Sequence, residues 1–355
     1  PPPPPPPPPH PPPPPPPPTP TLDLSSAASD VYKRQKVAVG PRTDENGVVT
    51  KTRVVVTRRP PGSALEIIER EAAIWLWEED RPIRADRLAA VVGDADGLYC
   101  MLTDTIDGAL LEAASGLRVV STMSVGTDHI DLTACTARGI PVGHTPDVLN
   151  ETTADTAFGL LMAAARRLGE GREYVRAGEW QRWEPELLLG HDVHGSTLGI
   201  IGLGRVGQAI ARRGLGFGMR VLYTARRRRP EAEASLGVVY RDLDGLLAES
   251  DHVVVATPLT AETTHLINAA ALSRMKPTAT LVNISRGGTV DSDALAVALQ
   301  SGEIATAGLD VTDPEPIPSG HPLVGLDNCF IVPHLGSSSR ATRDAMADLA
   351  AANLL

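Results

Sequence analysis

The chain has 355 residues, of which 42% are hydrophobic and 21% charged, and its formal net charge is −10. This composition allows one large folded domain or two ordinary ones, and it excludes a chain that is disordered throughout. The acidic balance argues against nucleic-acid binding, and no apolar run reaches the length of a membrane helix. Three widely spaced cysteines without a metal-ligand pattern indicate reduced thiols, no metal site and a cytoplasmic location.

The first 52 residues differ in composition from the rest. Residues 1–20 are almost entirely proline, which forms an extended helix that cannot pack a core but can bind proline-recognition modules. Residues 21–36 are unlike the rest of the chain, and their Val-Tyr-Lys-Arg-Gln stretch resembles translated vector sequence. We interpret residues 1–52 as a disordered or artefactual leader. The abrupt apolar Ala-Asn-Leu-Leu at the other end suggests a truncated C-terminus.

From Arg53 on, short apolar runs alternate with helical segments. The first half predicts helices over 64–73 and 151–168 and strands over 54–56, 97–101, 118–121 and 141–143. The second half predicts strands over 198–201, 220–223, 252–256, 280–284, 307–311 and 329–333. This alternation is typical of parallel sheets that are covered by helices on both faces.

A glycine motif, Gly-Leu-Gly-Arg-Val-Gly, occupies residues 202–207. It follows a predicted strand and opens a predicted helix, which is the context in which such a motif binds a dinucleotide. The first glycine permits a tight turn, the second lets the pyrophosphate approach the backbone, and the third lets the helix pack on the strand. The N–H groups at the helix start would hold the phosphates. The expected cofactor-binding residues here are Gly202, Gly204, Arg205, Val206 and Gly207.

The position of this motif near residue 200 indicates that another domain precedes it. We predict an α/β protein with two Rossmann-like domains, doubly wound parallel sheets and an active site in the cleft between the domains. The substrate-binding domain would begin with residues 53–148, and the dinucleotide-binding domain would span 149–339. Residues 340–355 would return to the substrate-binding domain.

The residues after the second predicted strand bear on the choice of cofactor. NAD enzymes place an acid there, but none occurs from Gln208 to Pro230, and the strand runs into four arginines over 226–229. Guanidinium groups suit a 2′-phosphate, because they carry charge and donate forked hydrogen bonds. We therefore predict that Arg226 and Arg227 favour NADPH, with NADH also possible.

Three charged or titratable side chains follow strands of the same predicted sheet: Arg286, Glu315 and His334. Ligands bind at the carboxyl ends of such strands. A cation there can hold a substrate carboxylate and polarise an oxo group, and an imidazole can act as the general acid. A carboxylate beside the histidine would fix its tautomer and favour its charged form. The sequence therefore predicts a catalytic set for proton and hydride exchange at C2 of a small 2-oxo or 2-hydroxy acid.

The motifs around these residues resemble those of the D-2-hydroxyacid dehydrogenase family. They are Asn-Ile-Ser-Arg-Gly at 283–287, the segment from Gly308 to Pro316, Pro-His-Leu-Gly-Ser at 333–337, and Ser-Thr-Met-Ser-Val-Gly at 121–126. Within the family, Thr-Pro-Asp-Val-Leu at 145–149, the pair Trp180 and Trp183, and Leu-Tyr-Thr-Ala-Arg at 222–226 resemble glyoxylate/hydroxypyruvate reductases of the animal type.

The resemblance implies a role for each matching residue. Arg286 would bind the substrate carboxylate and carbonyl, Glu315 would orient His334, and His334 would be the acid/base. The backbone N–H groups of Val125 and Gly126 would hold the carboxylate. Asp310 would face the nicotinamide amide near Ile284, and Trp183 would enter the partner's active site in a homodimer. The further cofactor contacts would be Pro258, Ile284, Asp310 and Ser337.

The expected activity is the NADPH-preferring reduction of glyoxylate and hydroxypyruvate to glycolate and D-glycerate. One alternative is an NAD-dependent D-3-phosphoglycerate dehydrogenase or another D-2-hydroxyacid dehydrogenase, although the former usually carries an acid after the second strand and often a regulatory domain. The other is a nucleotide-sensing scaffold, because corepressors that resemble this family keep the fold and the catalytic residues.

Overall fold

The computed structural model describes residues 42–43 and 49–355 of the chain. Most of the predicted leader lies outside the described residues. Within its described part, Arg42–Thr43 (β1) and Val49–Thr50 (β2) pair as a short antiparallel ladder, which the sequence did not predict. Among the described residues, no helix is long and apolar enough to cross a membrane.

A seven-stranded parallel sheet forms in the order β10-β9-β8-β11-β12-β13-β14. Its strands are β8 (Thr197–Ile201), β9 (Arg220–Thr224), β10 (Val239–Tyr240), β11 (His252–Val255), β12 (Thr280–Asn283), β13 (Thr306–Leu309) and β14 (Cys329–Ile331). The strand order runs outward in both directions from β8 and β11, so the sheet is doubly wound and its switch point lies between these two strands. The six strands predicted for this half are confirmed, and β10 is an additional edge strand.

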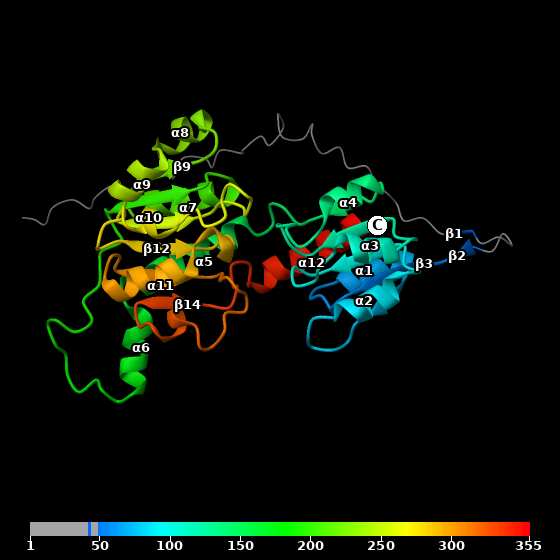
Figure 1. The fold of residues 1–355 in the computed structure, drawn as a ribbon, viewed down its shortest axis with the longest axis horizontal. Coiled ribbons are helices and arrows are strands. Elements are labelled where there is room, and N and C mark those ends of the chain that lie inside the picture. The colour runs from blue at the N-terminus through cyan, green and yellow to red at the C-terminus, as the bar shows by residue number, and fades with distance from the viewer. Residues whose placement is uncertain (1–41, 44–48) are drawn as a thin grey trace, which may run out of the picture. The chain divides into compact units, whose positions relative to one another are not determined.

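Helices cover both faces of this sheet (Figure 1). One face packs on α5 (Asn150–Ala165), α7 (Arg205–Gly216) and α8 (Pro230–Leu236), and the other on α9 (Leu243–Glu249), α10 (Ala269–Leu272) and α11 (Ser292–Ser301). Short 3₁₀ turns, η1 (Gly287–Thr289) and η2 (Pro322–Gly325), follow β12 and precede β14. Because both faces are buried, the strands are continuous apolar runs rather than alternating ones.

A five-stranded parallel sheet forms from the residues before 144, in the order β4-β3-β5-β6-β7. Its strands are β3 (Thr52–Val56), β4 (Ala72–Leu76), β5 (Gly97–Cys100), β6 (Val119–Thr122) and β7 (Val142–Gly143). The order again winds both ways from a first strand, here β3. The prediction of two Rossmann-like parallel sheets is thus confirmed.

The helix predicted over 64–73 ends two residues early. Helix α1 spans Ala64–Glu71, and Ala72 is already extended and begins β4. The two alanines continue the helical pattern in sequence, so pairing with β3, and not local propensity, decides this boundary. The other helices of this region are α2 (Ala85–Val92), α3 (Gly108–Ala113) and α4 (Leu132–Ala137).

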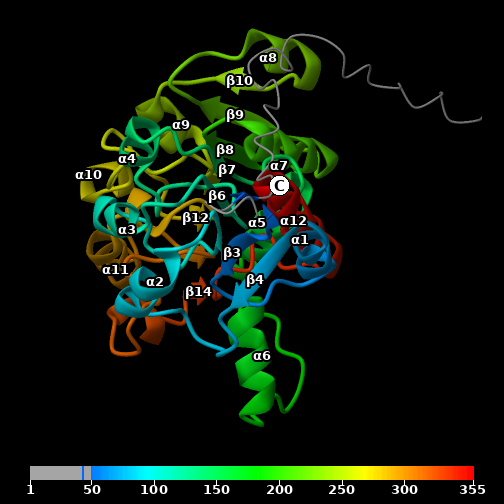
Figure 2. The ribbon, with the colours of Figure 1, turned by 90° about the vertical axis from the view of Figure 1, so that its right-hand side faces the viewer.

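Helix α12 (Arg340–Leu354) packs against α1, β5 and β6, although more than 200 residues separate it from these elements (Figures 1 and 2). Buried side chains bond to its carbonyl groups: the Tyr99 hydroxyl donates to Ala347 O (3.1 Å), and Ser121 Oγ donates to Ala350 O (2.7 Å). Asp348 accepts bonds from both the N–H and the hydroxyl of Ser63, at the start of α1. The last described helix therefore completes one face of the five-stranded sheet.

The single helix predicted over 151–168 is two helices. α5 ends at Ala165, Arg167 adopts a left-handed conformation (φ 52°), and α6 spans Leu168–Arg176. The loop 177–196 contains no helix or strand. In Figure 2, α6 and this loop stand away from the sheet strands.

Candidate active site

The glycine loop lies at the carboxyl end of β8, at the switch point of the seven-stranded sheet. Gly202 has φ 101°, which favours glycine, and a Cβ there would lie 2.6 Å from the carbonyl oxygen of Ala256. A Cβ on Gly207 would overlap the carbonyl oxygen of Gly202, whereas one on Gly204 would meet nothing within 4 Å. Gly204 therefore leaves open backbone at the positive end of α7, and this surface fits a pyrophosphate.

The side chain and the backbone N–H group of Arg205 have different surroundings. Its guanidinium pairs with Asp147 at 2.8 Å, while its N–H belongs to the first turn of α7 and has no intrahelical partner. Any contribution of Arg205 to a phosphate site in this conformation comes from its backbone.

The arginine-rich loop after β9 is organised by a glutamate that the sequence analysis did not single out. Arg228 donates two hydrogen bonds to Glu233, at 3.0 and 2.6 Å, and lies over the ring of Tyr240. The Tyr223 hydroxyl donates to the same carboxylate (2.6 Å) and accepts the N–H of Arg229. Both side chains lower the pKa of Glu233 through their hydrogen bonds, and the bond from Arg228 has the largest effect.

The two arginines predicted to read the cofactor remain outside this network. Arg226 and Arg227 are exposed, and no ion pair joins either of them to another described residue. They follow β9, which neighbours β8 in the sheet, so their charges lie on the side of the glycine loop where the second strand ends. This arrangement leaves two cations for an anionic group.

His334 and Glu315 form a close pair. Nδ1 of His334 lies 2.6 Å from Oε1 of Glu315, and no hydrogen bond from another described residue occupies the histidine's Nε2. Burial would raise the pKa of Glu315, but the hydrogen bond and charge of His334 bring it below its usual value, and the charge of Arg286 also contributes. Glu315 is therefore an ionised acceptor that holds one ring nitrogen and leaves the other free.

The backbone that carries His334 is held by Asp310. His334 has φ 53°, a left-handed conformation that histidine adopts more readily than most residues, and its N–H donates to Asp310 O (2.9 Å). The buried Asp310 carboxylate accepts the N–H groups of Leu335 (2.5 Å) and Gly336 (2.9 Å). Burial raises its pKa, although both bonds oppose this. The structure thus places Asp310 as an anchor of the loop after β14.

Arg286 follows β12 and contacts the loop after β6. Its Nε and Nη2 donate to Asp128 at 2.9 to 3.1 Å, and its Nη1 donates to Ser285 O (2.9 Å). The N–H groups of Val125 and Gly126 in that loop have no hydrogen-bond partner among the described residues. Two donors of the backbone and one arginine therefore meet here. Asp128 was missed from the sequence, because its partner lies 158 residues away.

The remaining predicted residues lie in different surroundings. Ile284 and Ser337 are buried, and the carbonyl of the exposed Pro258 accepts the hydroxyl of Thr263 (2.7 Å). Trp183 lies in the loop after α6 with 79% of its surface exposed, and no hydrogen bond or ring contact joins it to another described residue. The structure thus gathers the three catalytic candidates but leaves Trp183 apart from them.

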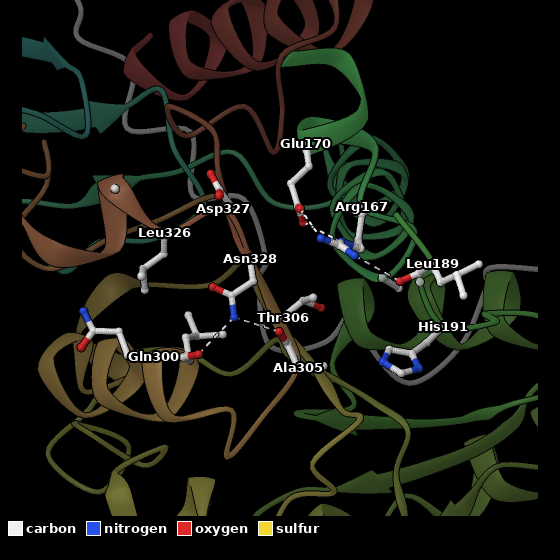
Figure 3. A pocket seen from close by; sticks show the side chains of 14 residues that line it. Arg167, Glu170, Leu189, His191, Gln300, Ala305, Thr306, Leu326, Asp327 and Asn328 are labelled. Carbon is white, nitrogen blue, oxygen red and sulfur yellow. Dashed lines mark hydrogen bonds and ion pairs between the residues drawn. The ribbon is translucent and has the colours of Figure 1, made fainter. Parts of the chain in front are cut away.

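A cavity of about 600 Å³ lies at the other end of the seven-stranded sheet (Figure 3). Thr306, which begins β13, and Asn328, which precedes β14, line it, and Asn328 donates to the carbonyls of Leu299 and Ala305. Ligands of doubly wound sheets bind at the carboxyl ends of the strands, not at this end. None of the predicted site residues lines this cavity, so it is separate from the candidate active site.

Known proteins share this architecture and these motifs. Residues 158–336 match the family described as D-isomer specific 2-hydroxyacid dehydrogenase, NAD binding domain. A glyoxylate reductase from Pyrococcus furiosus is 48% identical over 309 residues, covering 86% of this chain and 92% of the relative. The human glyoxylate reductase/hydroxypyruvate reductase is 49% identical over 307 residues, covering 85% and 94%. The archaeal and human relatives are thus similar to this chain to the same degree.

Solved structures agree with these relatives. A Thermus thermophilus protein superposes with a TM-score of 0.81 at 48% identity, covering 85% of this chain and 96% of that one. An NADPH-dependent glyoxylate/hydroxypyruvate reductase from Sinorhizobium meliloti, solved with NADP and malonate, gives a TM-score of 0.75 at 36% identity, covering 85% and 92%. The chain therefore belongs to the D-isomer-specific 2-hydroxyacid dehydrogenase family, whose members are nicotinamide-dependent oxidoreductases.

Proposed function

We propose that this enzyme reduces glyoxylate and hydroxypyruvate to glycolate and D-glycerate and prefers NADPH. The observation that carries the proposal is the 2.6 Å contact between His334 and Glu315, with the charge of Arg286 close enough to act on the same carboxylate. A general acid, its orienting carboxylate and a cation are the groups that reduction of a 2-oxo acid requires. The names of the Pyrococcus and human relatives support this choice of substrates.

The roles follow from the positions of the donors. Arg286 binds the substrate carboxylate and polarises the C2 carbonyl, and the N–H groups of Val125 and Gly126 hold the carboxylate from the other sheet. His334 donates its Nε2 proton to the carbonyl oxygen as negative charge develops there. Glu315 keeps Nδ1 protonated and the ring in place. NADPH, when bound, supplies the hydride to C2.

The preference for NADPH rests on Arg226 and Arg227. Both are exposed beside the glycine loop without an ion pair to a described residue, and no acid stands where NAD enzymes place one. A 2′-phosphate would supply the missing negative charge through charge-assisted hydrogen bonds. Pro258, Ile284, Asp310 and Ser337 would complete the contacts to the cofactor. The carboxylate of Asp310, which holds the loop after β14, would act there mainly by shaping the backbone.

We assign residues 53–148 and 340–355 to a substrate-binding domain and residues 149–339 to a dinucleotide-binding domain. The packing of α12 on α1, β5 and β6 supports the return of the chain. The active site would lie in the cleft between these domains, where Arg286 of one reaches Asp128 of the other. Residence in the cytoplasm stays a prediction from the cysteine pattern.

We also infer a homodimer. Large apolar side chains are exposed on α6 and the loop after it, namely Leu168 (55%), Val175 (54%), Trp180 (60%), Trp183 (79%) and Leu189 (64%). So many apolar side chains in one segment favour an interface over free solvent. In a dimer, Trp183 would reach the partner's active site. Light scattering on the purified chain tests this, and a monomer that keeps full activity would refute it.

Initial-rate kinetics test the function. Glyoxylate, hydroxypyruvate, pyruvate and 3-phosphohydroxypyruvate are each supplied with NADPH and with NADH, and oxidation of the cofactor is followed by absorbance. We expect the highest kcat/KM for glyoxylate or hydroxypyruvate with NADPH. Preference for 3-phosphohydroxypyruvate with NADH would instead identify a phosphoglycerate dehydrogenase. Tight cofactor binding without turnover of any 2-oxo acid would identify a nucleotide-sensing scaffold.

A further inference from the structure

Arg286 holds more hydrogen-bond partners than its predicted role requires. A guanidinium has five N–H donors in a rigid fork. Three are occupied: Nε and one Nη2 donor face Asp128, and one Nη1 donor faces Ser285 O. The two donors that remain, one on Nη1 and one on Nη2, have no hydrogen-bond partner among the described residues. Asp128 therefore covers the Nε–Nη2 edge of Arg286 and leaves two donors of the fork available.

The guanidinium also rests directly on Gly126. A Cβ built on Gly126 would overlap Nη2 of Arg286 and would lie 2.7 Å from Oδ1 of Asp128. Only a residue without a side chain lets the arginine approach the backbone of Gly126 this closely. Arg286, which follows β12, thereby lies against the loop after β6, whose Val125 and Gly126 N–H groups have no hydrogen-bond partner among the described residues.

Buried hydroxyl groups hold the loop that carries Asp128. Ser124 Oγ donates to Gly126 O (2.7 Å), and Thr122 Oγ1 lies 2.9 Å from Ser124 Oγ and 3.0 Å from Nε2 of His129. Thr122 and Ser124 are 0% and 4% exposed. Both flanks of Asp128 are thus tied down, so its carboxylate presents a fixed acceptor to Arg286.

We propose that Asp128 is a positioning residue for substrate binding: it aligns Arg286 so that the end of the fork faces the substrate carboxylate together with the Val125 and Gly126 N–H groups. The geometry of the Arg286–Asp128 contact carries this inference, which rests on the proposed reduction of a 2-oxo acid. The negative charge of Asp128 balances the positive charge of Arg286 before substrate binds. Burial would raise the pKa of Asp128, but the hydrogen bond and charge of Arg286 bring it below its usual value, so it stays ionised at neutral pH.

The test compares Asp128→Ala and Asp128→Asn with the wild type and with Asp244→Ala. Asp244 is an exposed aspartate on α9 that pairs with Arg274 at 3.1 Å. Its replacement by alanine therefore removes one negative charge and one ion pair, as Asp128→Ala does. Three quantities are measured: kcat and KM for glyoxylate, the Kd for NADPH by fluorescence, and the Kd for oxamate by calorimetry. Oxamate is a monocarboxylate isostere of a 2-oxo acid that cannot be reduced.

We expect Asp128→Ala to raise the KM for glyoxylate and the Kd for oxamate about tenfold or more, since small misplacements of a binding group are costly. Asp128→Asn, which keeps one acceptor oxygen, should lose less. The Kd for NADPH and the behaviour of Asp244→Ala should match the wild type. Oxamate binding that stays within twofold, or that becomes tighter in Asp128→Ala, overturns the proposal. A wild type that reduces no 2-oxo acid refutes the proposed function instead, and the oxamate titration still reports on Asp128.

Discussion

The loops at the carboxyl ends of the two parallel sheets carry different kinds of groups. The loops after the strands of the seven-stranded sheet carry charged side chains, Arg286, Glu315 and His334, and the glycine loop. The loop after β6 of the five-stranded sheet offers backbone N–H groups and one carboxylate, Asp128. In the proposed mechanism, the first sheet would supply the acid/base pair, the arginine that binds the substrate carboxylate and the cofactor site, and the second would supply a rigid frame for the substrate. Damage to the two ends should therefore differ in kind as well as in size.

The largest expected effect is at the seven-stranded end. His334→Ala should lower kcat by about 10²–10⁴-fold, because the general acid is lost while the binding groups remain. Stopped-flow oxidation of NADPH measures the rate of reduction directly. The KM for glyoxylate should change far less than kcat. A variant that keeps a tenth of the wild-type rate would show that another group supplies the proton.

The next largest effect tests the loop after β6 of the five-stranded sheet. Gly126→Ala should lower kcat/KM for glyoxylate by about 10–100-fold, because the new Cβ displaces Nη2 of Arg286. NADPH binding, measured by fluorescence titration, should be unchanged. Gly320→Ala is the control, since a Cβ there meets nothing within 4 Å. Equal losses in both variants, or none in either, would contradict the close approach of Arg286 to this loop.

A smaller effect separates the cofactors at the seven-stranded end. Replacing Arg226 and Arg227 by alanine should raise the Kd for NADPH on the order of tenfold or more relative to NADH, since each charge-assisted contact contributes about 1.5–3 kcal/mol. Arg81→Ala with Arg84→Ala removes two exposed arginines of the five-stranded region and serves as the control for charge. The same loss for both cofactors would show that these arginines do not read a 2′-phosphate.

The smallest effect tests the contact between Glu315 and His334 at the seven-stranded sheet. Glu315→Gln should retain part of the activity, and its kcat/KM should lack the fall at low pH that protonation of Glu315 causes in the wild type. The hydrogen bond and charge of His334 hold the pKa of Glu315 below its usual value, so this fall lies at lower pH than for an ordinary glutamate. The measurement is kcat/KM against pH, with Glu112→Gln on α3 as the control. An unmoved profile would make Glu315 a purely structural partner.

The sequence predicts most of the seven-stranded sheet because each strand is a continuous apolar run that ends at a turn residue. The sequence also predicts the glycine loop and the catalytic candidates, because each of them lies in a motif of consecutive residues. Edge strands β4 and β10 escape prediction, because they form by pairing with a neighbour rather than by their own pattern. The break at Arg167 has no signal either, since arginines suit the last turn of a helix.

Residues that act across long separations could not be found from motifs. The partner of Asp128 lies 158 residues further along the chain, and the contact depends on how two separate sheets are placed. Glu233 illustrates a shorter case: it binds Arg228 and Tyr223 across the turn into α8, where a surface glutamate would look ordinary. In both cases the sequence shows the residue type but not the tertiary contact that gives it a role.

We expect the packing of α12 to impose an order of events on folding. Val54, Tyr99 and the other apolar side chains of one face of the five-stranded sheet are buried with Ile68 of α1 and with Met346, Ala350 and Leu354 of α12, so part of this face stays uncovered until α12 has been synthesised. The seven-stranded sheet is encoded between the two parts and has its own buried clusters. During translation it can therefore fold first, and its compaction shortens the distance that α12 must span, offsetting part of the entropy of closing so long a loop. We expect the nascent first half to depend on chaperones more than the second.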